Sequence, residues 1–452
     1  MTKMKRCILF GLIIALLLSG CSPSASQGGT TASTDSALNT LAAEDTSASS
    51  ESGGISSEAY DRFRAGTYAT FAETDQFYFW KPIGSEGQRI YYYEKNSGTS
   101  GVLCFKPECR HNGRSCDAFV GVDCLTGSLS VRDGMLYWVG MDVSAVKSED
   151  IENSFGIWRM RIDGTEREFF GPFEFDEYVK YSFQIAYLWG DFYYFAGSAQ
   201  RYQPGKQPGG SPEISNHVTL TRVPVSGGAV ELLGEFTDVE NPQPPMLLLD
   251  TDSVYLFMGG VAENDDESYS YTLSLFRYHI AENRTEILLK NKQMKDGVDE
   301  VRLHPAKGII ATPGPLKASG EYNPGDPLLY SLTEGQLTPW LDLSESPYTR
   351  IYFMEEGLLL MRYERGESVQ TKFEYELRDM EGNVVSSGVL APPFLKPESR
   401  KGAGFWAIWG GCREFFTEIW DHDTSIHYLL RYRVTPEGLQ ETILIQAEPD
   451  TD

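Results

Sequence analysis

Residues 128–140 and 156–171 read SLSVRDGMLYWVG and GIWRMRIDGTEREFFG, and this stretch decides the fold. Asp-Gly pairs at 133–134 and 163–164 interrupt runs rich in β-branched and aromatic residues. Such pairs favour tight hairpins, because glycine accepts the positive φ that the turn requires. The stretch therefore predicts two hairpins in one four-stranded unit, with strands at Ser128–Arg132, Met135–Val139, Gly156–Ile162 and Thr165–Phe170.

The same four-strand pattern recurs along the chain from Thr67 onward. The residues that match Tyr137, 50 to 61 residues apart, are Tyr78, Tyr194, Tyr255, Ile310, Leu360 and Phe416. A long period with four strands in each unit is typical of a β-propeller. We therefore predict an all-β fold, a propeller of four-stranded antiparallel blades. Seven blades fit best, and six or eight stay open because the fifth and seventh repeats align loosely.

The N-terminus predicts a targeting segment. A basic MTKMKR precedes the apolar run CILFGLIIALLL, which is too short and wrongly flanked for a stable membrane span. Leu18-Ser19-Gly20-Cys21 resembles the lipobox of bacterial lipoproteins. The resemblance implies that residues 1–20 are a signal peptide and that the Cys21 thiol is lipidated, whereas the alternative is an ordinary signal peptide with a chance cysteine. Two or three acyl chains would anchor the protein firmly to the outer face of a bacterial cell membrane.

Residues 21–58 begin with Cys21 and continue in serine, threonine, alanine and glycine. With almost no large apolar side chains, this segment buries too little surface to offset the entropy of ordering it. We expect a disordered tether that holds a single propeller domain, residues 59–452, away from the membrane.

The opening stretch carries a family resemblance. Leu136-Tyr137-Trp138, Ile157-Trp158-Arg159 and Asp163-Gly164 resemble the Tyr-Trp-Thr-Asp repeat of low-density-lipoprotein-receptor-type propellers. Val139 and Gly140 stand where that repeat has Thr and Asp. With its lipobox, the chain also resembles lipid-anchored bacterial β-propeller lipoproteins. The resemblance implies a binding scaffold, and it assigns no catalytic residue.

The repeat also predicts a ligand-binding face. In a four-stranded blade, the connection between the second and third strands lies on the same face as the connection between blades. The longest insertions fall at the former position: Met141–Phe155, Ser198–Asn216, Val261–Ser270, Pro313–Gly325 and Arg365–Gln370. Function tends to reside on loops that a rigid scaffold holds in place. We expect Tyr202, Tyr269 and Tyr322 to be ligand-face loop residues, and drift in solvated loops is the alternative.

A cysteine cluster lies between the first and second repeats. Cys104, Cys109, His111 and Cys116 have the spacing C-x4-C-x-H-x4-C, and Cys124 follows. Three thiolates and an imidazole suit a closed structural zinc site. Outside the cytoplasm thiols tend to oxidise, so disulfides among the four cysteines are an equally open alternative. We expect the cluster to lie on the loop-rich face.

The composition narrows the function. A net charge of −25 repels phosphate backbones and argues against nucleic-acid binding. No serine-hydrolase, zinc-protease, P-loop or dinucleotide motif occurs. We therefore predict a monomeric, membrane-anchored binding or scaffold propeller whose ligand is a glycan, a peptide or a protein. The alternative is a cell-surface enzyme that acts on polysaccharide or peptide.

Overall fold

A computed structural model describes residues 70–448 apart from fifteen short gaps. The gaps are 84–88, 121–123, 142–153, 177, 204–212, 237–241, 265–268, 295–297, 305–307, 314–327, 344–347, 349, 355–356, 363–372 and 396–402. The expected signal peptide, the lipidated Cys21, the tether and Tyr322 lie outside the described residues. No helix of the described part is long and apolar enough to cross a membrane.

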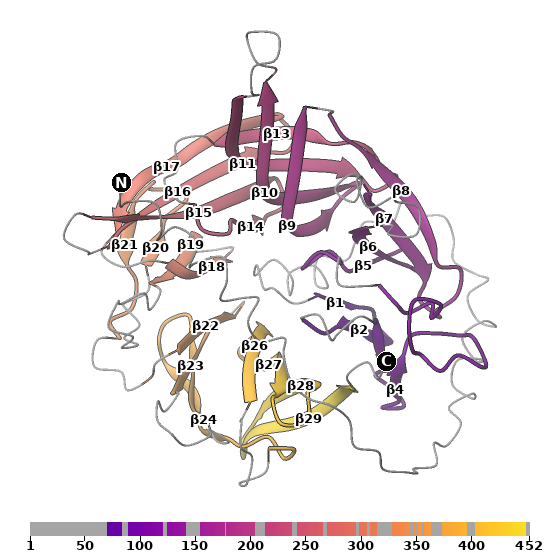
Figure 1. The fold of residues 1–452 in the computed structure, drawn as a ribbon. Helices are drawn as coiled ribbons and strands as arrows, with labels where there is room; N and C mark the ends of the chain where they lie inside the picture. Colours follow the sequence, from indigo (N-terminus) through magenta and orange to yellow (C-terminus); the bar gives the residue numbers. More distant parts are fainter. Residues whose placement is uncertain are drawn as a thin grey trace, which may run out of the picture.

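The fold is an all-β propeller with seven blades of four antiparallel strands, as the sequence predicts (Figure 1). Blades 1 and 2 are β1 (Thr70–Glu73), β2 (Phe77–Lys81), β3 (Tyr91–Glu94), β4 (Ser100–Val102), and β5 (Ser130–Arg132), β6 (Met135–Met141), β7 (Phe155–Arg161), β8 (Glu168–Glu174). Blades 3 and 4 are β9 (Val179–Trp189), β10 (Phe192–Gln203), β11 (Glu213–Pro224), β13 (Glu231–Phe236), and β14 (Met246–Leu249), β15 (Ser253–Glu263), β16 (Tyr269–His279), β17 (Arg284–Met294).

The remaining three blades complete the ring. They are β18 (Val298–His304), β19 (Gly308–Pro313), β20 (Leu328–Tyr330), β21 (Leu337–Pro339); β22 (Arg350–Met354), β23 (Gly357–Arg362), β24 (Phe373–Asp379), β25 (Val384–Leu390); and β26 (Ala403–Gly410), β27 (Glu414–Asp421), β28 (Ile426–Thr435), β29 (Gly438–Ala447). One short strand was not predicted. β12 (Gly228–Ala229) leaves blade 3 and pairs in parallel with β8 at the outer edge of blade 2.

Seven apolar clusters hold the ring together, one between each pair of neighbouring blades. The alternation of side chains along each strand explains this arrangement. In β2, Phe77 and Phe79 face blade 2, whereas Tyr78 and Trp80 face blade 7. Because both faces of a blade are buried, the strands read as continuous aromatic and aliphatic runs rather than as an apolar–polar alternation.

The ring closes without strand exchange. All four strands of blade 1 come from the N-terminal part of the described chain, and all four of blade 7 come from its C-terminal part. The last blade lies beside the first (Figure 1). At this closing seam the rings of Phe71, Trp409 and Phe416 pack together with centroids 5.2–5.9 Å apart. Side-chain packing and hydrogen bonds, rather than a shared sheet, therefore join the two ends.

Two predicted loops are in part strands. The β10–β11 and β15–β16 hairpins extend into the predicted insertions 198–216 and 261–270, and β15 runs well beyond the four residues of β14. Tyr202 lies in β10 opposite Ile214, and Tyr269 is the first residue of β16, so neither is a loop residue as predicted. The reason is that neighbouring strands of a hairpin satisfy each other's backbone groups, so pairing continues past the blade.

Candidate metal centre

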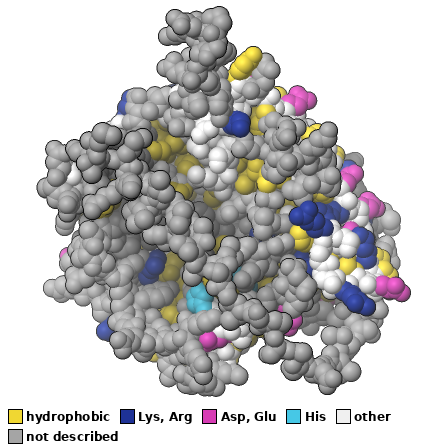
Figure 2. All heavy atoms as spheres, viewed as in Figure 1, with side chains coloured by type: hydrophobic (Ala, Val, Ile, Leu, Met, Phe, Trp, Pro, Cys, Tyr) yellow, Lys and Arg dark blue, Asp and Glu magenta, His cyan; other side chains and the backbone are white. Residues whose placement is uncertain are grey.

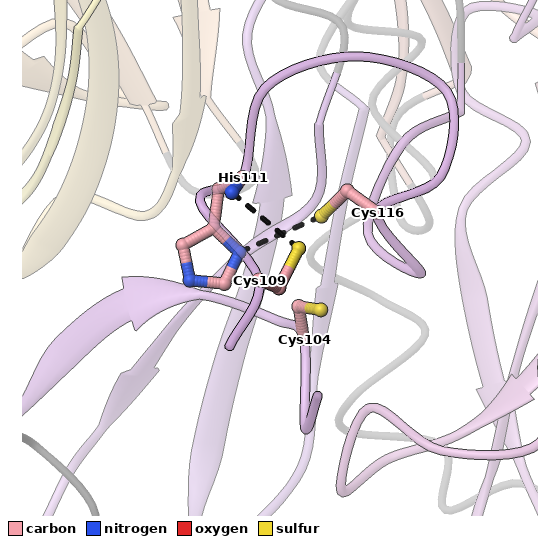
Figure 3. Close-up of side chains that lie close together, drawn as sticks. All are labelled: Cys104, Cys109, His111 and Cys116. Carbon is pink, nitrogen blue, oxygen red and sulfur yellow. Dashed lines mark hydrogen bonds between the residues drawn. The ribbon is translucent and has the colours of Figure 1, made fainter. Parts of the chain in front are cut away.

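Four side chains from the connection between blades 1 and 2 converge on one point. Cys104 lies two residues after the end of β4, and the other three side chains come from the turns after it. Cys109 N donates to Lys106 O at 3.1 Å, and His111 has a positive φ of 55°. These turns fold the segment back, so that Cys104, Cys109, His111 and Cys116, named here the cysteine–histidine group, face one another (Figure 3).

The geometry of the cysteine–histidine group suits a metal ion. The three sulfur atoms and one imidazole nitrogen lie within 4.8 Å of one another. Ligands at 2.0–2.3 Å from a tetrahedral zinc ion are separated by roughly 3.5–3.8 Å from each other. Cys116 Sγ lies 3.6 Å from His111 Nδ1, which falls in that range. The group can therefore hold a metal ion after a small contraction.

Burial shifts the pKa values of His111 and Cys116 in opposite directions. Cys104 and Cys116 are buried, and Cys109 and His111 are half-buried. Burial, reinforced by the neighbouring Cys104, raises the pKa of Cys116 to about 12. Burial, with a smaller contribution from Arg89, lowers the pKa of His111. The imidazole is therefore neutral and ready to ligate at neutral pH, whereas the Cys116 thiol must release a proton to the solvent when a cation binds.

Blade 2 fixes the cysteine–histidine group from the other side. Arg167 Nη1 donates to Cys116 O at 3.2 Å, and its guanidinium lies over the Trp158 ring. Gly164, with a φ of +84°, passes so close that a Cβ there would lie 3.3 Å from Cys104 N. Arg167 and Gly164 belong to the β7–β8 turn, on the short-turn side of blade 2. The cysteine–histidine group therefore lies between two blades and contacts a short turn of blade 2, and its place on the loop-rich face stays a prediction.

The fourth clustered cysteine stands apart. Cys124 Sγ lies 3.9 Å from Ser128 Oγ and 4.0 Å from Leu125 O, and it is not a member of the cysteine–histidine group. The five described cysteines, including the buried Cys412, form no disulfide with one another. The structure thus brings together four of the five predicted ligands, and the buried Cys124 packs in the apolar cluster between blades 1 and 2.

The closing seam contains the polar contact that the sequence did not reveal. Glu418 is fully buried, and its carboxylate accepts hydrogen bonds from Trp80 Nε1 at 3.1 Å and Ile83 N at 2.7 Å. His427 Nδ1 lies 3.0 Å from Oε1 and donates to it, since a carboxylate only accepts. A buried charge is stable only when it is hydrogen-bonded in this way. No local pattern could have shown it, because Glu418 and Trp80 are 338 residues apart.

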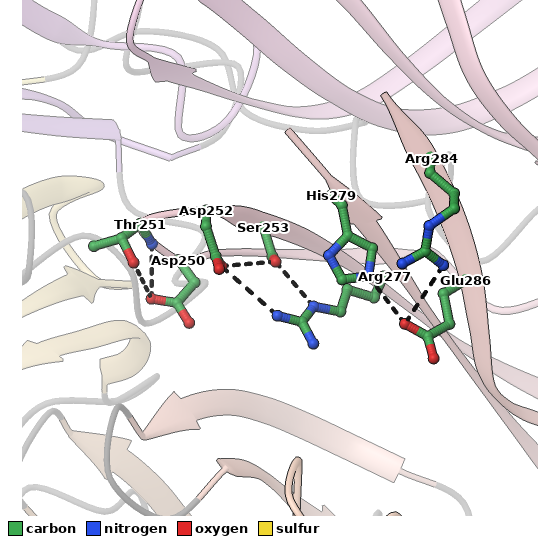
Figure 4. Close-up of polar contacts among 8 residues, drawn as sticks. All are labelled: Asp250, Thr251, Asp252, Ser253, Arg277, His279, Arg284 and Glu286. Carbon is green, nitrogen blue, oxygen red and sulfur yellow. Dashed lines mark hydrogen bonds and ion pairs between the residues drawn. The ribbon is translucent and has the colours of Figure 1, made fainter. Parts of the chain in front are cut away.

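A polar cluster in blade 4 resembles a catalytic arrangement only in composition. Ser253 and His279 are opposite each other in the β15–β16 register, and His279 Nε2 lies 2.9 Å from Glu286 (Figure 4). The Ser253 hydroxyl, however, accepts from Arg277 Nε at 2.9 Å and donates to Asp252 at 2.8 Å. Ser253 is buried and has no bond to His279, so it lacks an activating base. The cluster is therefore a set of hydrogen bonds and ion pairs between neighbouring strands rather than a catalytic arrangement.

Charged side chains of both signs are visible on one face of the described residues. On the face drawn in Figure 2, Lys and Arg side chains gather over the region of blades 1 and 2, with acidic side chains around them. Beside the cysteine–histidine group, Arg110 and Arg114 are exposed, and Lys106 pairs with Asp117 at 2.7 Å. Tyr269 is 41% exposed at the end of its hairpin. The described aromatic surface on the loop-rich side therefore includes one of the three predicted tyrosines.

Comparison with known proteins finds distant likenesses among solved structures. No family model and no curated protein matches the chain. Among solved structures it is similar to prolyl oligopeptidase B from Galerina marginata, with a TM-score of 0.45 and 13% identity over 87% of this chain and 52% of that chain. It is also similar to dipeptidyl peptidase 4 from Porphyromonas gingivalis, with a TM-score of 0.40 and 10% identity over 89% of this chain and 63% of that chain.

A third similar structure is the GH32 β-fructofuranosidase from Bombyx mori, with a TM-score of 0.29 and 13% identity over 87% of this chain and 92% of that chain. The chain spans about half the length of the oligopeptidase, 52%. With TM-scores of 0.45 or less, these likenesses carry no argument about this chain.

Proposed function

We propose that this chain is a lipid-anchored, extracytoplasmic binding scaffold: a monomeric propeller, stapled by zinc, that presents a ligand site on its loop-rich face. The observation that carries the proposal is the contrast between the two ends of the blades. On one side β15 and β16 pair over eleven residue positions and extend past the inner strand, and Tyr269 is exposed at their end. On the other side the strands are joined by short turns, such as Arg132–Met135.

Zinc is the metal that the ligand set favours. Soft thiolates together with one imidazole select zinc over magnesium or calcium, which prefer oxygen ligands. Four protein ligands fill a tetrahedral shell and leave no open position for a substrate. The proposed metal therefore has a structural role: it ties the connection between blades 1 and 2 and leaves the chemistry of the protein to other residues.

The alternative function is a cell-surface enzyme that acts on polysaccharide or peptide. It requires a nucleophile with a base or a pair of convergent carboxylates. Among the described residues the nearest approach is the Ser253–His279–Glu286 set, which lacks the bond between serine and histidine. Binding is therefore the function that the described side chains favour.

A glycan and peptide array tests the binding function with the full chain. Tyr269→Ala should weaken retention of the array ligand at least tenfold, because an exposed aromatic ring on a rigid hairpin suits stacking. Glu437→Ala, in the short β28–β29 turn, is the control and should bind as the wild type does. Binding that depends on Glu437 and not on Tyr269 would place the site on the other face. Turnover of an array glycan or peptide would favour the enzyme.

The membrane anchor is tested separately. The full chain expressed in a bacterium should take up a labelled fatty acid and partition into the detergent phase. Cys21→Ala should lose the label and remain soluble. Equal partitioning of both forms would contradict lipidation at Cys21 and leave the array result unaffected.

A further inference from the structure

The outer edge of blade 6 differs from the outer edges of the other blades. Outermost strands of a sheet expose unpaired backbone groups, and proteins protect them with charge, proline or short length. Strand β25 reads VVSSGVL and has none of these protections over seven residues. The other described outer strands carry charged residues or proline, or are only three residues long: β4 (SGV), β8 (EFFGPFE), β13 (ELLGEF), β17 (RTEILLKNKQM), β21 (LTP) and β29 (GLQETILIQA).

The apolar side chains of β25 face solvent. Val384 and Val389 are each 54% exposed and Val385 is 41% exposed. Ser387 and Val389 lie on one face of the strand, whereas Leu390 on the other face is buried between blades 6 and 7, and Val385 lies at a register shift of the β24–β25 pairing. β25 pairs with β24, and no described strand pairs with its outer edge. Backbone donors and acceptors and β-branched side chains are thus presented together.

Blade 2 shows that an outer edge of this propeller accepts an added strand. There β12 pairs in parallel with β8, at Phe173 and Glu174. The approach is close: a Cβ on Gly171 would lie 2.7 Å from Gly227 N. The two glycines therefore permit the contact within the chain. Among the strands that the structure describes, β24 is the one that pairs with β25, so the outer edge of β25 can accept an added strand.

Charge selects the occupant. Asp379 at the end of β24 and the exposed Glu381 lie beside the start of β25, whereas Glu374, opposite Val389, is paired with Arg362 at 3.3 Å. The whole chain has a net charge of −25, so a second copy would bring the same charge to this edge. A basic segment would be attracted instead. We propose that β25 is a docking strand for an extended, β-branched segment of a partner protein that carries Lys or Arg at its flanks, bound by strand addition.

Peptide binding to the full chain tests this proposal. The probe is a fluorescein-labelled peptide, Lys-Lys-Thr-Val-Thr-Val-Thr-Lys-Lys, and the readouts are fluorescence anisotropy and amide hydrogen exchange. The peptide should bind and slow exchange within residues 384–390. The double variant Val385→Lys with Val389→Lys should bind at least tenfold more weakly, because it places like charges on the edge. A peptide with Glu in place of each Lys should also bind at least tenfold more weakly.

Ile287→Lys on β17 is the matched control, because Ile287 is 56% exposed on an outer strand that already carries charges. It should leave binding unchanged. Equal losses at β17 and β25, or binding without protection of residues 384–390, would overturn the proposal. A wild-type dimer in sedimentation that the β25 variant abolishes would also overturn it, because the occupant would then be a second copy. Melting curves verify that each variant is folded.

Discussion

Blade 1 is held on its two sides by different devices. Toward blade 2, the chain is continuous, and its connection folds into the cysteine–histidine group between the blades. Toward blade 7 the chain is not continuous, and buried aromatic rings and the Glu418 carboxylate join the ends. Blade 1 has strands of only three to five residues. The comparison indicates that a small blade depends on its contacts with both neighbouring blades. On one side these are the side chains of the cysteine–histidine group, which can hold a metal ion, and on the other side they are the hydrogen bonds of the buried Glu418 carboxylate.

Of the variants considered for these two contacts of blade 1, removal of the Glu418 carboxylate should lower the free energy of unfolding the most. Glu418→Ala leaves the donors of Trp80, Ile83 and His427 without their shared acceptor. Breaking such a buried arrangement costs about 3–5 kcal/mol, measured as the free energy of unfolding by denaturant titration. Hydrogen exchange should show the loosening first in β1–β4 and β26–β29.

Glu414→Ala is the matched control for the closing seam. It removes an ion pair with Arg433, whose side chain is 52% exposed, and such pairs contribute about 0–1 kcal/mol. If Glu418→Ala cost no more than Glu414→Ala, packing alone would close the ring.

Removing a metal ligand should give the next largest effect, confined to the other joint. Cys116→Ser should lower zinc affinity at least about 100-fold. Substituting a residue that only hydrogen-bonds to a metal ligand usually costs about 10- to 100-fold, and removing the ligand itself should cost more. At free zinc 100 times above the wild-type Kd, zinc should stabilise the wild type by about 2.7 kcal/mol and a variant with 100-fold weaker affinity by only about 0.4 kcal/mol, so the variant should be about 2.3 kcal/mol less stable. Zinc titration followed by thermal unfolding measures both quantities.

Cys124→Ser is the control for the metal ligands, because Cys124 lies outside the cysteine–histidine group. It should keep the zinc affinity of the wild type. A Cys124 variant that lost zinc as Cys116→Ser does would show that the fourth ligand is a thiolate rather than His111.

Alkaline pH should give a smaller and separable effect on the metal-free chain. The pKa of Cys116 is raised from 9.0 to about 12 in the folded state. The folded state therefore favours the protonated thiol, and this contribution is complete below pH 9 and is lost as the pH rises toward 12. The loss should be about 2 kcal/mol by pH 10.5, since one pKa unit corresponds to about 1.4 kcal/mol.

The controls for the pH effect are the zinc-loaded chain and Cys116→Ala. In the loaded chain the thiolate is held by the metal, so stability should stay flat between pH 9 and 10.5. In Cys116→Ala the titrating thiol is absent. A metal-free wild type whose stability did not fall in this interval would contradict the burial of Cys116.

The sequence revealed the periodic parts of this structure. The Asp-Gly turns at 133–134 and 163–164 and the second-strand positions from Tyr78 to Phe416 repeat, so they predicted the blades and their number. The C-x4-C-x-H-x4-C spacing likewise indicated which four side chains come together, because they are close along the chain. Contacts across the ring were not predictable. The hydrogen bonds from Trp80 to Glu418 and from Arg167 to the Cys116 carbonyl join residues that are far apart in the sequence, so no local sequence pattern predicts them.

The metal content and the thiol count of one sample test the central claim, that the joint between blades 1 and 2 is a metal-binding staple. The full chain is purified from membranes without added metal or chelator, then analysed by plasma mass spectrometry and by thiol titration in denaturant. We predict one zinc ion per chain, with the thiols of Cys104, Cys109 and Cys116 reduced. A metal-free chain with a disulfide between two of these three cysteines would contradict the account.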